Sequence, residues 1–204
     1  KKDILKKHPV YNIQNFKADL SKKELYINTF KNHLKAHSFI EKPHRHNFYL
    51  LVLFTNGTGK HEIDFAKYEI KPGSLFVLQP GQIHNWQLSA DIDGYIFFYS
   101  SAIYNLYFGN KKLEDYPFYQ SVMNQPEIVL DENEVNIIKP FFDLMITESQ
   151  TDLHKDHQCI QIGEYAKIFK REAMNIERSQ QPIDDPPQNG TQSVNGRMGR
   201  EGTQ

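Results

Sequence analysis

The sequence has little of several features that would point to common protein classes. Its one cysteine, Cys159, cannot form an internal disulfide. Positive and negative side chains almost cancel, with a net charge of −1, so the chain has no basic field to hold a polyanion such as DNA. It also has no N-terminal apolar stretch typical of a signal peptide or a membrane span. We therefore expect a cytoplasmic protein that binds neither membranes nor, by itself, DNA.

Motifs of the common enzyme classes are also missing. There is no glycine-rich phosphate loop, no nucleophile elbow and no pair of catalytic carboxylates. The sequence therefore favours a protein that is not an enzyme. His33 and His37 have helical i, i+4 spacing, but their flanks are typical of strand and loop and no zinc-protease glutamate follows His33. His154, His157 and Cys159 form a cluster that we expect to be a solvated surface.

Apolar and aromatic residues are plentiful, at 39% and 13% of the chain, and they come in short segments. From residue 24 to 130 these segments are separated by turn signals such as NGTG at 56–59 and PG at 80–81, which predicts a mainly β barrel or sandwich. Gly57 and Gly59 are expected to supply the positive φ of a tight hairpin. After that turn, HEIDFAKYEI is expected to form a strand in which Ile63 and Phe65 alternate with polar residues.

The ends of the chain differ from this central part. Residues 1–23 are predicted to form an N-terminal arm, and residues 179–204, rich in Pro, Gly and Gln, a disordered tail. Residues 131–178 are predicted to be helical, in two stretches. The first begins at Asp131 as its N-cap and contains Pro140, which is expected to kink or split it.

One face of the first predicted helix is apolar. It is expected to form the interface of a homodimer, or alternatively to pack on the barrel of its own chain, and it consists of Val135, Ile138, Phe142 and Met145.

Two histidines lie one residue apart at the start of an apolar run. Residues i and i+2 of a strand face the same side, so His44 and His46 are expected to project together. A turn before His84 could bring it onto the neighbouring strand. Three histidines with an open position can form a catalytic zinc or iron site.

The motifs HRHNFY, GTGKHEIDF, IKPGSLFVLQPGQIHNW and DGYIFFYS resemble, in order and spacing, the cupin-type N-terminal domain of AraC-type transcription regulators. This resemblance implies a double-stranded β-helix that holds a small-molecule effector, followed by one or two helices that dimerise. It also implies DNA binding through a C-terminal helix-turn-helix domain. Residues 159–204 contain no such motif, so we expect that domain to be missing from this chain.

The resemblance also bears on the histidines. Cupin enzymes carry a glutamate four or five residues past the second histidine, where this chain has Leu50 and Leu51, so no metal and no cofactor is expected. We predict instead a ligand pocket with histidines at its rim and aromatic walls, formed by His44, His46, Phe48, His84 and Trp86. Three alternatives remain open: that Phe48 and Trp86 belong to the packed core, that His44 or His84 is a structural residue hydrogen-bonded to a neighbouring carbonyl, and that the chain is a small metal-dependent cupin enzyme with a three-histidine site.

Overall fold

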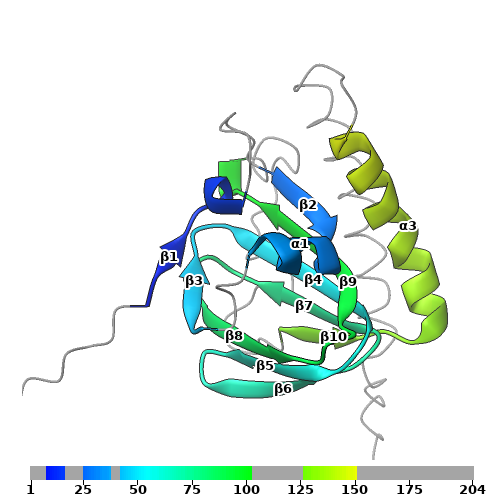
Figure 1. Ribbon diagram of the computed structural model, residues 1–204, viewed down its shortest axis with the longest axis horizontal. Helices are drawn as coiled ribbons and strands as arrows, with labels where there is room; N and C mark the ends of the chain where they lie inside the picture. Colours follow the sequence, from blue (N-terminus) through cyan, green and yellow to red (C-terminus); the bar gives the residue numbers. More distant parts are fainter. Residues whose placement is uncertain (1–7, 17–24, 38–41, 103–125, 151–204) are drawn as a thin grey trace, which may run out of the picture.

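The computed structural model describes residues 8–16, 25–37, 42–102 and 126–150, which form two facing β-sheets and a long helix (Figure 1). The predicted second helical stretch and the predicted tail lie outside these residues, as does Cys159. In the described part of the chain, no helix combines the length and the hydropathy needed to cross a bilayer. The mainly β fold class expected from the sequence is confirmed.

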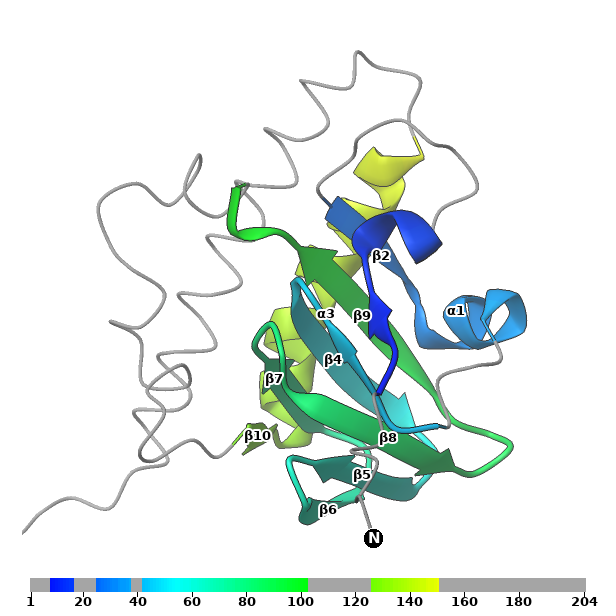
Figure 2. The same ribbon diagram turned by 90° about the vertical axis from the view of Figure 1, so that its left-hand side faces the viewer.

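Each sheet has five strands. In spatial order the first sheet contains β1 (Val10–Tyr11), β3 (His44–His46), β8 (Ile83–Leu88), β5 (Gly59–Ile63) and β6 (Ala66–Ile70). The second contains β10 (Glu127–Val129), β7 (Ser74–Leu78), β4 (Tyr49–Asn56), β9 (Asp93–Tyr99) and β2 (Leu25–Thr29). All pairings are antiparallel except that of β1 with β3. Figure 2 shows the two sheets facing each other.

The second sheet is buried on both faces. Alternate residues of β4 point in opposite directions, so Leu50 and Val52 join a core between the two sheets, while Leu51 and Leu53 join a core on the outer face. We call these the interior core and the outer core. A strand with apolar neighbours on both sides has no polar face, which explains the unbroken apolar run at residues 50–54.

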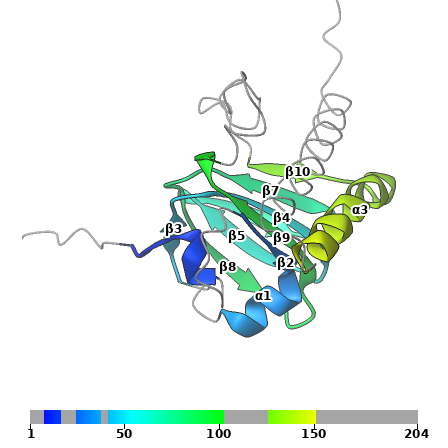
Figure 3. The same cartoon turned by 90° about the horizontal axis from the view of Figure 1, so that it is seen from above.

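The helix α3 (Glu132–Ser149) covers the outer core, as the view from above shows (Figure 3). Asp131 and Glu134 form a reciprocal capping box at its start, which agrees with the predicted N-cap. The helix continues through Pro140 and is not split there.

Three of the four residues predicted for a dimer interface are covered by their own chain. Ile138, Phe142 and Met145 are fully buried in the outer core, and Val135 packs against it partly exposed. This is the alternative that the sequence left open, and it means that these side chains cannot contact a second subunit. The exposed apolar residues of α3 are Ile137 and Leu144.

Two predicted turns take a different form. Gly57 has the expected positive φ of 80°, but β4 and β5 lie in different sheets, so residues 56–59 form a corner and not a hairpin. Gly59 is required there because a Cβ would overlap the Gln87 carbonyl oxygen. The predicted strand after it is interrupted: Asp64 and Phe65, both with positive φ, form the turn between β5 and β6, so Phe65 is exposed.

Two short helical segments contact each other, with Phe16 of one stacked on His33 of the other. A 3-10 helix, η1 (Ile13–Phe16), follows β1, and α1 (Phe30–Ala36) follows β2 with Thr29 as its N-cap. The prediction of strand and loop around His33 and His37 was therefore wrong. His33 lies in α1 and is buried, and His37 caps its C-terminus.

Candidate functional site: a buried histidine cluster

Four histidines from three neighbouring strands of the first sheet face the space between the sheets. His44 and His46 come from β3, His84 from β8 and His61 from β5. The strand register sets this arrangement, because His44 lies opposite His84, while His61 lies opposite Trp86 and thus diagonal to His84. We call these four residues the histidine cluster.

The three histidines predicted from the sequence therefore do converge. One ring nitrogen from each of His44, His46 and His84 lies within 4.8 Å of the others. Their position differs from the predicted pocket rim, because all three are buried, with at most 4% of the side chain exposed. His61, also fully buried, was not singled out from the sequence.

Ring nitrogens of the cluster are linked in a chain. His46 Nε2 lies 2.7 Å from His84 Nε2, and His84 Nδ1 lies 3.0 Å from His61 Nε2. His44 Nδ1 lies 2.7 Å from the backbone oxygen of Lys42. A carbonyl oxygen only accepts hydrogen bonds, so His44 Nδ1 must donate, and the lone pair of a neutral His44 is then on Nε2.

Several nitrogens of the cluster have no hydrogen-bond partner among the described residues: His44 Nε2, His46 Nδ1 and His61 Nδ1. Buried polar atoms without partners are uncommon in native proteins and call for an explanation such as a bound ion, water or ligand. Three of the unpartnered buried polar atoms in the described structure thus belong to the histidine cluster.

Burial keeps these imidazoles neutral. Desolvation, reinforced by the neighbouring imidazoles, holds the pKa of His46, His61 and His84 well below the usual range. The pKa of His44 is also lowered by burial, against the opposing effect of its hydrogen bond to Lys42. Among the described residues, no carboxylate joins the group of converging nitrogens. At neutral pH the cluster thus offers uncharged nitrogen donors.

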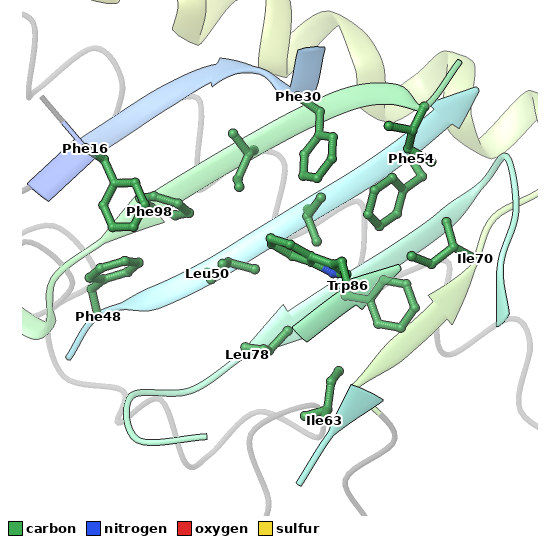
Figure 4. Packing of buried hydrophobic residues seen from close by; sticks show 14 of the residues in the cluster. Phe16, Phe30, Phe48, Leu50, Phe54, Ile63, Ile70, Leu78, Trp86 and Phe98 are labelled. Carbon is green, nitrogen blue, oxygen red and sulfur yellow. The ribbon is translucent and has the colours of Figure 1, made fainter. Parts of the chain in front are cut away.

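Aromatic side chains surround the cluster, and Figure 4 shows how they fill the interior core. The ring centroid of Phe48 lies 4.5 Å from that of His46, and the ring of Trp86 lies 4.9 Å from His84 and 5.0 Å from His61. Phe48 and Trp86 are each about 1% exposed, so they belong to the packed core, as the alternative from the sequence held.

The N-terminal arm closes the histidine end of the interior. Its strand β1 pairs with β3, with Tyr11 opposite His46. Phe16 is buried, with its ring 5.9 Å from His46 and stacked on His33 at 5.5 Å. The site that includes the histidine cluster is therefore closed to solvent by residues of the arm.

His33 forms a second buried site next to Phe16. Its Nδ1 lies 2.9 Å from the hydroxyl of Tyr26, and its Nε2 has no partner among the described residues. Burial, with smaller contributions from His37 and His44, lowers its pKa to about 3. The helical spacing of His33 and His37, preceded by Thr29 as an N-cap, was the sequence signal that could have placed both on a helix.

Comparisons with known proteins found distant structural similarities and one family match. Among solved structures the chain is similar to the AraC-like transcriptional activator CuxR, with 12% identity over 80% of this chain and 55% of that one, and a TM-score of 0.45. It is also similar to apo ToxT of Vibrio cholerae (14% identity, 74% and 58% covered, TM-score 0.41) and more weakly to oxalate decarboxylase of Bacillus subtilis (17% identity, 29% and 18% covered, TM-score 0.28).

The chain thus spans less than three fifths of the length of each of these structures. No curated protein matches the sequence. The AraC-like ligand binding domain, as a sequence family, matches residues 24–161, about two thirds of the chain and nearly all of its described structure. On this match, the chain belongs to the family of AraC-like ligand binding domains.

Proposed function

We propose that this domain is a cytoplasmic sensor that binds a small-molecule effector between its two sheets and transmits binding to a separate DNA-binding domain. The residues proposed to contact the effector are His44, His46, Phe48, His84 and Trp86. Membership of a ligand-binding family supports the sensing role. The convergence of three buried histidines, together with the unpartnered Nε2 of His44, supports this choice of site.

The observation that carries the proposal is the second sheet with a core on each face. Phe98 of β9 contacts Phe48 and Phe16 in the interior, while its neighbours Phe97 and Tyr99 pack in the outer core under α3. Packed cores resist small deformations, so a shift of β9 caused by a ligand would be felt on both faces. Effector binding can therefore alter how α3 packs on the second sheet.

The arm is the second element that binding would affect. An organic effector needs room, and the interior beside His46 is closed by Tyr11 and Phe16. We propose that such an effector displaces the arm from this position. The chain then has two states, one with the arm docked and one with the arm displaced. An effector that binds the second state more tightly shifts the population toward it, to an extent set by the difference between its two affinities.

Dimerisation is proposed through the outer surface of α3. Ile137 and Leu144 are one heptad apart, so they lie on the same face of the helix, and 49% and 44% of their side chains are exposed. Sedimentation of the chain at micromolar concentration tests this. We expect a dimer that Leu144→Glu converts to a monomer; a monomeric wild-type chain contradicts the proposal.

The sensing role is tested with a panel of sugars, aromatic acids and aliphatic acids. A binding compound at about 100 times its Kd should add about 2.7 kcal/mol of stability, which a thermal melt detects easily. His46→Gln should abolish the effect, and the surface variant Lys67→Gln should keep it. Hydrogen exchange then tests transmission: amides of α3 and residues 8–16 should change on binding, and a ligand that changes neither contradicts the proposed route.

The enzyme alternative has one supporting observation, which is that three histidines do converge. It would require turnover of a substrate by metal-loaded protein, so product formation in the same compound panel separates the two functions.

A further inference from the structure

A backbone hydrogen bond fixes the tautomer of His44. Its Nδ1 donates to the Lys42 oxygen at 2.7 Å, so the lone pair of Nε2 is directed elsewhere and has no partner among the described residues. A histidine whose other nitrogen is held by a backbone carbonyl is the usual arrangement of a metal ligand, because this hydrogen bond fixes the tautomer and the ring orientation.

His61 can give His84 the same arrangement. His84 Nδ1 lies 3.0 Å from His61 Nε2, and when Nδ1 donates in this bond, the lone pair of His84 is on Nε2. That atom lies 2.7 Å from His46 Nε2, so one of the two nitrogens must hold a proton between them when no other species is present. His46 Nδ1 has no hydrogen-bond partner among the described residues, so nothing there prevents the proton of a neutral His46 from moving to Nδ1 and leaving the lone pair on Nε2.

The size and chemistry of this place suit a single ion. One ring nitrogen from each of His44, His46 and His84 lies within 4.8 Å of the others. Two nitrogen ligands of one Zn²⁺ ion are at most about 4.2 Å apart, so the rings need to move closer only by about half an ångström. Tyr11 and Phe16 of the arm lie against His44 and His46, and an organic molecule here would have to displace one of them. Neutral imidazoles bind Zn²⁺, Cu²⁺, Ni²⁺, Co²⁺ and Fe²⁺, whereas Mg²⁺ and Ca²⁺ require oxygen ligands.

We propose that His44, His46 and His84 bind a divalent transition-metal ion through their Nε2 atoms, and that His61 is the positioning residue that orients His84. This differs from the absence of metal expected from the sequence, where the lack of a glutamate at Leu50 or Leu51 was decisive. The structure supplies what the sequence does not display, namely a carbonyl and a fourth histidine that preset two of the three ligands.

The missing carboxylate also indicates the class of effector. Three neutral imidazoles leave the full charge of a dication uncompensated among apolar side chains, which is costly. An anion in the open coordination position removes this cost. The effector of the proposed sensor is therefore assigned to small anions with a carboxylate or similar oxygen donor, and this part of the inference rests on the proposed function.

Metal binding is tested on the whole chain, stripped with a chelator and titrated with Zn²⁺ or Co²⁺ against a chromophoric competitor at pH 7. We expect one equivalent to bind and Mg²⁺ not to compete. His44→Ala, His46→Ala and His84→Ala should each weaken binding by about 100-fold or more, since loss of an outer-shell partner alone costs about 10–100-fold. His33→Gln, a matched control at a buried histidine that is not one of the three proposed ligands, should bind like wild type.

The role of His61 is tested with two variants. His61→Phe removes the acceptor for His84 and should weaken Zn²⁺ binding by about 10–100-fold, whereas His61→Gln keeps an acceptor oxygen and should restore most of the affinity. Equal losses in both variants would show that His61 only packs, and would overturn its positioning role.

The visible spectrum of the Co²⁺-loaded wild-type chain decides the question even where a variant fails to fold. Intense bands of a four-coordinate site with nitrogen ligands are expected, and acetate should shift them while glucose should not.

Weak octahedral bands, or affinity unchanged in the variants of His44, His46 and His84, would mean an adventitious ion only and overturn the metal site. Bands insensitive to every anion tested would overturn the effector class. Stabilisation of metal-free protein by the compound panel would leave the sensor proposal standing if the metal site fails.

Discussion

Acid should destabilise this domain through its buried histidines, and His33 allows the effect to be calculated. Its pKa falls from 6.5 to about 3 on folding, because its ring is buried between Phe16, Tyr26 and Phe98. The unfolded chain therefore binds more protons than the folded chain below pH 6.5. The stabilisation is complete above pH 6.5 and is lost as the pH falls toward 3.

The size of the effect follows from the linkage of proton binding and folding. At pH 5 the solution is about 1.5 units below the unfolded pKa, and each unit corresponds to about 1.4 kcal/mol, so His33 alone costs about 2 kcal/mol relative to neutral pH. His46, His61 and His84, whose pKa values are also lowered, add to this loss in the same direction. Against a total stability of about 5–15 kcal/mol, acid unfolding above pH 4 is expected.

Urea unfolding followed by circular dichroism at pH 7 and pH 5, with a chelator present, measures this loss. His33→Gln should reduce the difference between the two pH values by about 2 kcal/mol. An equal pH dependence in wild type and His33→Gln would refute the reasoning, because it would mean that His33 binds its proton equally well in the folded chain.

Three further predictions concern packing. Phe16→Ala should lower the free energy of unfolding by about 3–5 kcal/mol, as for other buried phenylalanines, and a loss well below this range in urea titrations would show that the arm is not docked. Gly94→Ala should lower the melting temperature sharply, since a Cβ would overlap the Leu53 carbonyl oxygen, and an unchanged melt contradicts the β4–β9 register. Ile138→Ala should cost about 2–5 kcal/mol and Lys139→Ala, at an exposed position of the same helix, about 0.5 kcal/mol or less, a contrast that calorimetry of both variants checks.

Local signals predicted much of the fold. Asp131, followed by acidic residues and an apolar periodicity, located the start of α3, because a helix N-terminus needs side-chain acceptors for its free N–H groups. The parity of His44 and His46 predicted that they face one side, and the antiparallel register of β3 with β8 brings His84 to them. The first signal depends on contacts within a few residues. The second depends on the pairing of β3 with β8, which the turn before His84 suggested.

What the sequence did not reveal depends on longer-range contacts. His61 stands alone in its segment, and only the pairing of β5 with β8 places it beside His84. The direction of the apolar face of α3 could not be decided either, because a stripe that packs on a sheet and one that packs on a partner have the same periodicity. Phe65 was misplaced since its alternation matched a strand, while the β5–β6 pairing required a turn there.

The position of Trp86 has a practical consequence. It is the only tryptophan of the chain, it is buried, and its ring touches both His61 and His84. An open-shell ion such as Co²⁺ or Cu²⁺ next to an excited indole quenches its emission, whereas closed-shell Zn²⁺ does not. The protein therefore contains its own optical probe, and the occupancy of its interior can be followed in real time, at low concentration and without any label.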